Sequence, residues 1–152
     1  MRRLLLVFVL AAAMGTVALP AGATPPTQSE ITNPIPDVFD PNPTDFTATG
    51  GVVCAAGTAE GVHFKPAGGG ATGVNFQIVK KFTCGDGEFF VKLQVRLSFD
   101  TSTTTFNWNV VGGTGAYEDL HGSGSGFSTL CGPDCVIDNY VGGFHIDPRP
   151  HS

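Results

Sequence analysis

The feature that most constrains this chain is a glycine-rich stretch from Val110 to Phe127, which reads VVGGTGAYEDLHGSGSGF. Its first glycines can adopt the positive φ angles that tight turns need and that side chains resist. Its later glycines recur at every second position, so in a strand they share one face. A bare glycine face permits sharp bending or close approach of a large side chain, as expected where a sheet closes into a barrel. The glycines concerned are Gly112, Gly113, Gly115, Gly122, Gly124 and Gly126.

The same stretch superficially matches a phosphate-binding loop. The G-x-G-x-x-G fingerprint, counted from Gly113 and Gly115, has Glu118 where its third glycine belongs. No Gly-Lys-Ser/Thr sequence follows, and the Glu118 and Asp119 carboxylates repel a phosphate group. The stretch therefore indicates architecture rather than nucleotide binding.

Alternating apolar residues predict an all-β chain. In Glu88–Phe99 every second residue from Phe89 onward is apolar and most of the others are polar, which predicts a half-buried antiparallel strand. About seven or eight strands joined by hairpins indicate a barrel or a sandwich, and the glycine pattern favours the barrel. The other predicted strands are Gly51–Thr58, Val62–Phe64, Val74–Cys84, Thr104–Val111, Gly124–Leu130 and Val136–Ile146.

The run GGTGAY…LHGSGSG resembles the GGTGxYxxLxGxG turn of the allene oxide cyclase barrel and dirigent-like superfamily. The wider pattern is similar to a group of small secreted bacterial proteins with that barrel, and it covers about Thr49 to Ile146. The resemblance implies a single closed antiparallel β-barrel of about eight strands. It does not imply cyclase or dirigent activity, because the catalytic residues of neither family match this chain. The remaining elements of the pattern are Val53-Cys54, Lys80-x-Phe82-x-Cys84, LQVRLSF followed by Trp108, and Asp138-x-Tyr140.

The N-terminus has the pattern of a secretory signal peptide over residues 1–23. Arg2 and Arg3 precede the apolar run Leu4–Met14, and Ala21-Gly22-Ala23 is a typical cleavage site. The mature protein is therefore expected to be secreted.

Three further segments follow the signal peptide. Residues 24–45 are rich in proline, which predicts a disordered linker, with the alternative that Ile31, Ile35, Val38 and Phe39 lie along the barrel wall. Residues 46–147 form the predicted barrel domain, and residues 148–152 form a frayed tail. The formal net charge is −5, and loss of the two signal-peptide arginines makes the mature chain more acidic. This charge argues against nucleic acid as a partner and against anionic membranes. The apolar run Leu4–Met14 is too short for stable membrane insertion.

The four cysteines are even in number in a chain predicted to be secreted, so disulfides are expected. Three pairings are possible. Cys131 and Cys135 flank Gly-Pro-Asp, a natural turn, which pairs them and leaves Cys54 to pair with Cys84. A zinc site is disfavoured because the C-x3-C spacing has no second cysteine pair beside it.

No constellation of residues predicts catalysis, a metal or a cofactor. The histidines His63, His121, His145 and His151 form neither H-x-x-x-H nor a triad-like context. Ser123 and Ser125 lack the glycines that G-x-S-x-G requires on both sides. The acidic residues Asp37, Asp40 and Asp45 are interrupted by prolines and lack calcium-loop spacing.

Lys80 is the most informative polar residue. Alternation places it with Phe76, Ile78, Phe82 and Cys84 on the inward face, where an unpaired ammonium is costly. The partners proposed for it are Asp138 or Glu60, with Tyr140 nearby. The alternative is a lysine at a strand end that extends its ammonium into solvent. With Trp108, these residues are the ligand-binding candidates: Lys80, Asp138, Tyr140, Glu60 and Trp108.

These observations lead to three hypotheses about function. The first is a non-catalytic secreted barrel that binds a small apolar or aromatic ligand, or a partner in the cell envelope. The second is an isomerase or cyclase that acts in the barrel lumen, and it rests on fold analogy alone. The third is a structural module. A filled lumen favours the third hypothesis, and a pocket with polar groups at its floor favours the first two.

Overall fold

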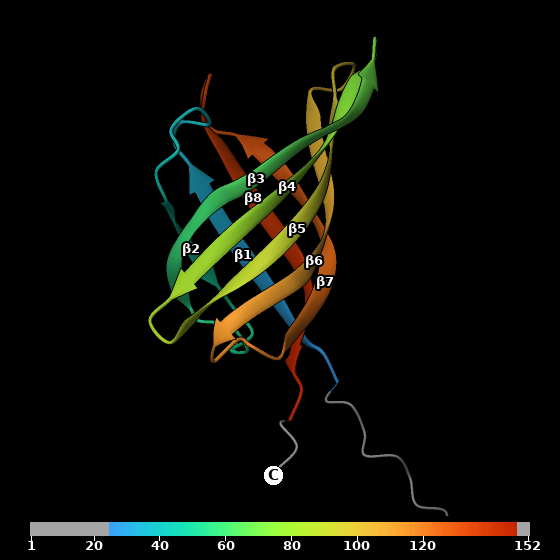
Figure 1. The fold of residues 1–152 in the computed structure, drawn as a ribbon. Helices are drawn as coiled ribbons and strands as arrows, with labels where there is room; N and C mark the ends of the chain where they lie inside the picture. The colour runs from blue at the N-terminus through green and yellow to red at the C-terminus, as the bar shows by residue number, and fades with distance from the viewer. Residues whose placement is uncertain (1–24, 149–152) are drawn as a thin grey trace, which may run out of the picture.

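The computed structural model describes residues 25–148, so the signal peptide predicted for 1–23 and most of the predicted tail lie outside the described residues. The described chain forms eight antiparallel strands that are hydrogen-bonded in chain order, and β8 returns to β1 to close a barrel (Figure 1). The predicted fold class is confirmed. The strands are β1 (Thr27–Ile35), β2 (Thr44–Ala48), β3 (Ala56–Gly70), β4 (Gly73–Cys84), β5 (Gly87–Ser98), β6 (Thr103–Gly115), β7 (Leu120–Leu130) and β8 (Val136–Ile146).

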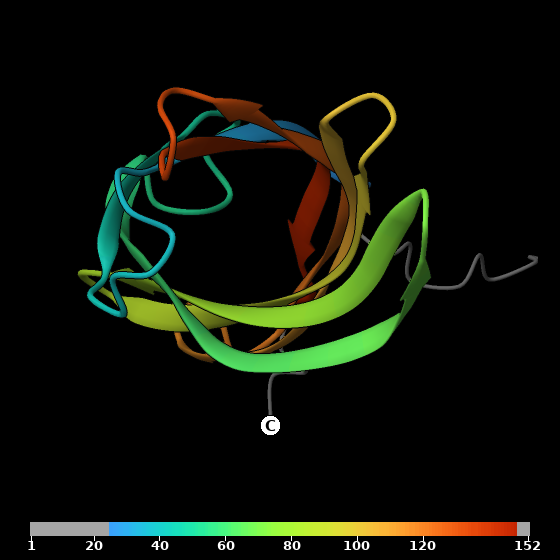
Figure 2. The same ribbon diagram turned by 90° about the horizontal axis from the view of Figure 1, so that it is seen from above.

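Every second side chain along a strand points into the barrel, and these side chains fill it. On β5 the side chains of Phe89, Val91 and Leu93 are at most 1% exposed, whereas Gln94 and Arg96 face solvent. The ring seen from above in Figure 2 is therefore packed with side chains rather than empty. Most of this core is aromatic, and its aromatic members are Phe46, Phe82, Phe89, Phe106, Trp108, Tyr117, Tyr140 and Phe144.

The N-terminal segment differs from its predicted role. Residues 24–45 were expected to be a disordered linker, yet β1 pairs with β8 from Thr27 to Ile35 and forms the closing seam of the barrel. The barrel therefore begins at Thr27 rather than at residue 46. Most prolines of the segment lie at the end of β1 or in the 36–43 loop, where a strand needs no ladder N–H.

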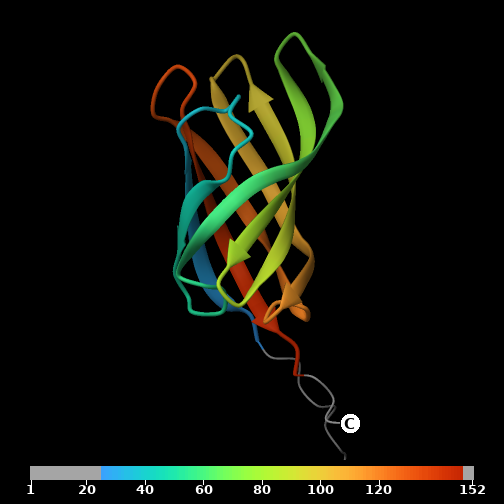
Figure 3. The same ribbon diagram turned by 60° about the vertical axis from the view of Figure 1, so that its left-hand side comes forward.

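The first strand predicted within the barrel also differs. The first part of the predicted strand Gly51–Thr58 lies in the loop formed by residues 49–55, in which Gly50 and Gly51 have φ angles of 93° and 73°. The predicted strand Val62–Phe64 is part of β3. This strand is 15 residues long and projects with β4 beyond the barrel wall (Figure 3).

The glycine ladder of β7 is a packing surface for aromatic rings. A Cβ atom built on Gly122 would lie 2.6 Å from Phe144 Cδ1, and one on Gly124 would lie 2.8 Å from Trp108 Cζ2. A Cβ on Gly126 would collide with the ring of Phe106. The Trp108 ring stacks on Phe144 with centroids 4.9 Å apart. The glycines thus let large side chains of β6 and β8 lie against the main chain of β7.

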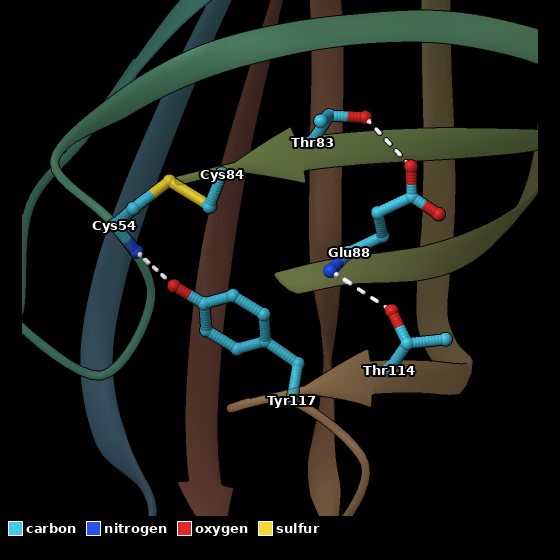
Figure 4. The surroundings of a disulfide bond; sticks show 6 residues. All are labelled: Cys54, Thr83, Cys84, Glu88, Thr114 and Tyr117. Carbon is cyan, nitrogen blue, oxygen red and sulfur yellow. Dashed lines mark hydrogen bonds between the residues drawn. A yellow bond between two sulfur atoms is a disulfide. The ribbon is translucent and has the colours of Figure 1, made fainter. Parts of the chain in front are cut away.

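The two predicted disulfides are confirmed. Cys54 and Cys84 join the β2–β3 loop to the end of β4, with Cα atoms 6.0 Å apart. Next to this bond, the Cys54 N–H donates a 3.1 Å hydrogen bond to Tyr117 Oη (Figure 4). Cys131 and Cys135 close the β7–β8 loop, with Cα atoms 5.0 Å apart. The first bond closes a longer loop and by chain entropy stabilises the fold by roughly 3–4 kcal/mol.

Gly124→Ala should destabilise the barrel by about 1–3 kcal/mol, because the methyl group meets the Val141 carbonyl and the Trp108 ring in a filled core. Gly112→Ala is the control, since a Cβ on Gly112 meets nothing within 4 Å. Urea unfolding measures both variants. Equal unfolding free energies for the two would contradict the packing role of the ladder.

Candidate functional site

Lys80 reaches across the barrel interior to the opposite wall. Its side chain comes from β4 and is almost fully buried, and its Nζ lies 2.7 Å from Asp138 Oδ2 on β8. The same ammonium donates a 3.0 Å hydrogen bond to Asn33 Oδ1 on β1. The predicted pairing of Lys80 with Asp138 is confirmed, and the alternative of an ammonium in solvent is wrong.

Further hydrogen bonds extend this pair into a network. Ser128 Oγ on β7 donates to Asp138 Oδ1 at 2.6 Å. Asn33 Nδ2 donates to Thr44 Oγ1 at 2.8 Å and to the Asp45 carbonyl at 3.0 Å, both on β2. Five strands thus contribute to one buried polar cluster, which satisfies most of its charged and amide groups. We call Lys80, Asp138, Asn33, Ser128 and Thr44 the polar cluster.

Sequence reasoning did not single out three members of the polar cluster. Asn33 follows Ser29 and Ile31 at period two, but the surrounding prolines indicated a linker. Ser128 continues the period-two series of the glycine ladder, a signal that marks it as an inward residue. Thr44 lies in the same proline-rich segment.

Glu60 does not join the polar cluster, contrary to one of the two predicted pairings. Ala59 points inward with 3% exposure, so alternation turns its neighbour Glu60 to the outer surface. There Glu60 Oε1 lies 2.7 Å from Lys81 Nζ, and Glu88 Oε1 lies 3.6 Å from the same ammonium. The hydrogen bond with Glu60 is the main reason that the pKa of Lys81 is raised; burial opposes it, and the charges of Glu60 and Glu88 add to the rise.

Tyr140 lies beside the polar cluster in the aromatic core. Its side chain is 1% exposed, and Lys80 Nζ lies 6.0 Å from its ring centroid. Its hydroxyl makes no hydrogen bond of good geometry within residues 25–148. Burial first, and then the neighbouring Asp138 carboxylate, raise the pKa of Tyr140 well above its usual value. The phenol is therefore held neutral.

Trp108 has a packing role instead of a place at an open site. It is 3% exposed and stacked on Phe144, and its Nε1 donates a 3.0 Å hydrogen bond to the Ser125 carbonyl. Its indole therefore has no free donor to offer a ligand.

A hollow of about 370 Å³ opens above the polar cluster. It lies at the barrel end that carries the 36–43 loop, between that loop and the β3 and β4 strands, and we call it the mouth hollow. Asn33 and Lys80 provide its buried polar groups, and Ile35, Val38 and Ile78 provide apolar surface. Below it, Phe82 and Tyr140 are at most 1% exposed and fill the lumen. A separate hollow of about 450 Å³, lined by residues from Pro34 to Asp45, has only Thr44 in common with the polar cluster.

Two histidines lie together on the outer surface at the opposite end of the barrel. His121 and His145 stack with ring centroids 5.3 Å apart, and their Nε2 atoms lie 3.3 and 3.6 Å from the Asp147 carboxylate. In the described part of the chain, no group of His, Cys, Asp and Glu side chains is arranged to hold a metal ion. His151 lies outside the described residues.

Comparisons with known proteins do not assign the chain to a family. No family model, no curated protein and no solved structure matches it. Among residues 25–148 there is no helix long and apolar enough to cross a membrane. The structural evidence for function is therefore the polar cluster and the hollow above it.

Lys80→Met should lower the free energy of unfolding by about 3–5 kcal/mol, because it leaves the Asp138 carboxylate buried without a counter-charge. Adding Asp138→Leu should recover most of the lost unfolding free energy, because it removes the unpaired carboxylate. Lys81→Met is the matched control on the adjacent, solvent-facing position and should change stability little. Chemical unfolding of the four proteins tests the buried pair, and a loss from Lys80→Met no larger than the control's would refute it.

Tyrosine absorbance offers a test of the buried phenol. The chain has two tyrosines, and the pKa of each is raised, chiefly by burial. The folded protein should therefore show little tyrosinate at about pH 10, where the unfolded chain is half ionised. Since the unfolded state then binds fewer protons, the unfolding free energy should fall as the pH rises above about 10. A native titration that coincides with that of the unfolded chain would contradict the burial of both hydroxyls.

Proposed function

We propose that the chain is a non-catalytic binding protein whose mouth hollow takes a small, largely apolar molecule with one hydrogen-bond acceptor. The observation that carries the proposal is the position of Lys80 at the polar end of this hollow. An ammonium has three N–H donors, and two of those on Lys80 are directed to Asp138 and Asn33. The third donor is available to an acceptor on a ligand.

The charge of the polar cluster restricts the chemistry of that acceptor. Asp138 balances the charge of Lys80 at 2.7 Å, so the pair has little net attraction for an anion. A neutral carbonyl or ether oxygen suits the remaining donor better than a carboxylate does. The volume of about 370 Å³ falls within the range of small-molecule sites, and Ile35, Val38 and Ile78 suit an aromatic or aliphatic body.

Catalysis in the lumen receives less support. An isomerase or cyclase needs space for its substrate next to a proton donor or acceptor. The side chain with the strongly shifted pKa, Tyr140, is 1% exposed and surrounded by Phe82, Phe106 and Trp108. A substrate in the mouth hollow would have to displace this packing to reach it.

The proposal includes a secreted location and a place in the allene oxide cyclase and dirigent-like superfamily. Two disulfides support an oxidising compartment, in agreement with the signal-peptide pattern of residues 1–23. The closed eight-stranded barrel is compatible with the resemblance in GGTGAY…LHGSGSG. A partner in the cell envelope remains an alternative occupant of the same opening.

Benzophenone and diphenylmethane form a matched pair of probes, because they have the same two rings and differ in the carbonyl acceptor. Benzophenone should raise the melting temperature more than diphenylmethane does. At about 100 times its dissociation constant a ligand adds about 2.7 kcal/mol to the unfolding free energy, a shift of several degrees.

Gly61→Phe tests whether benzophenone binds in the mouth hollow. Gly61 lines the mouth hollow, and a Cβ there meets nothing within 4 Å, so a side chain can be added at this position and its ring is expected to take up ligand volume. Gly112→Phe is the control, at a glycine outside the hollow that is equally free of neighbours. The proposal fails if the carbonyl makes no difference, or if Gly61→Phe responds to benzophenone as the control does.

A further inference from the structure

One edge of β3 has no partner strand over most of its length. The pairing of β2 with β3 ends at Thr44 and Ala59, whereas β4 continues to pair with β3 as far as Gly70. In the described chain, no main-chain hydrogen bond reaches the other edge of residues 60–70. Every residue from Gly61 to Gly70 is exposed. This edge presents a row of free N–H and C=O groups, which is a template for another strand.

The usable part of this edge is short and amphipathic. Pro66 and the irregular register between Pro66 and Gly69 interrupt it on one side, and a second irregularity, between Gly61 and His63, lies within it at Val62. Before this point, Val62 and Phe64 are 48% and 62% exposed. The Phe64 ring packs beside the Phe76 ring at a centroid distance of 5.4 Å. The segment 60–65 therefore combines free backbone groups with exposed apolar side chains, and we call it the β3 edge.

We infer that the β3 edge pairs with the same edge of a second copy of this chain, in an antiparallel dimer with twofold symmetry. Antiparallel strands pair through identical surfaces, so an isologous contact closes after two copies. The resulting sheet runs from one barrel into the other and covers Val62 and Phe64 of both copies.

The charges at the two ends of the β3 edge favour this self-pairing. Glu60 and Glu88 share Lys81, so that end carries two carboxylates against one ammonium and is net negative. Lys65 lies at the other end and makes no ion pair within residues 25–148. An antiparallel arrangement brings Lys65 of each copy to the Glu60 end of the other, so opposite charges meet twice.

Charge exchange tests this arrangement directly. Sedimentation equilibrium of the wild-type protein should show a monomer–dimer equilibrium. Lys65→Glu and Glu60→Lys should each raise the dissociation constant by about tenfold, because each turns two attractive contacts into repulsive ones. An equimolar mixture of the two variants should recover association, since the heterodimer then pairs opposite charges at both ends. Lys81→Met controls for loss of the Glu60–Lys81 pair and should still dimerise.

A second pair of variants tests the role of the backbone. Pro66 has no N–H, so its nitrogen faces the unpaired edge, and Phe64, two residues earlier, directs its N–H the same way. Phe64→Pro should abolish dimerisation while leaving the β4 ladder and the circular dichroism spectrum intact. Phe64→Ala, which keeps the N–H, should dimerise more tightly than Phe64→Pro.

Three results would overturn the inference. They are a wild-type chain that stays monomeric at every concentration, a mixture of the charge variants that does not recover association, and equal association of Phe64→Pro and Phe64→Ala. A monomer would leave the β3 edge to a strand from a different protein.

Discussion

The packing of large aromatic rings against bare main chain is the interaction on which this barrel depends. Trp108 and Phe144 stack face to face and lie over Gly122 and Gly124, where any side chain would collide with them. An eight-stranded barrel has an interior just wide enough to be filled by side chains. Here the rings come mainly from β4, β5, β6 and β8. The inward positions of β7 include Gly122, Gly124 and Gly126, which leave room for these rings. The lumen is consequently solid, and any ligand site is confined to an end or a side.

The polar cluster sits where this solid core ends. A buried ion pair is costly to desolvate, and it is tolerated only when further hydrogen bonds satisfy both partners. Asn33 and Ser128 provide such bonds at 3.0 and 2.6 Å. Because the partners come from strands on opposite sides of the ring, the cluster also ties the closing seam of β1 and β8 to β4. A group that joins the walls of a barrel beneath an open hollow is well placed to orient a ligand.

The mouth hollow and the free β3 edge have a common origin in the shortness of β2. That strand has only five residues, so β3 loses its neighbour after Ala59. The loop 36–43 bends away at the same level, which leaves a lateral opening lined by Glu60 and Gly61 on one side. A longer β2 would both fill this opening and pair with the free edge of β3. The proposed ligand site and the proposed dimer contact are therefore neighbours that meet at Glu60 and Gly61.

The sequence by itself determined the features that follow from local patterns. Alternation placed β4, β5 and β8 almost to the residue, and the glycine series predicted a closed barrel. Cysteine spacing identified both disulfides, and an inward lysine among apolar residues implied a buried partner, for which Asp138 was one of two choices. Only the tertiary structure decided between Asp138 and Glu60, because the outcome depends on which strands face each other across the ring.

Tertiary structure also places the proline-rich segment in the barrel, as β1 and the first residues of β2, and brings Asn33 to Lys80. Barrel closure pairs residues more than a hundred positions apart, such as Thr27 with Phe144, and no local pattern encodes such a contact. Hydrogen bonding to β8 can therefore order a segment whose own composition favours an extended chain.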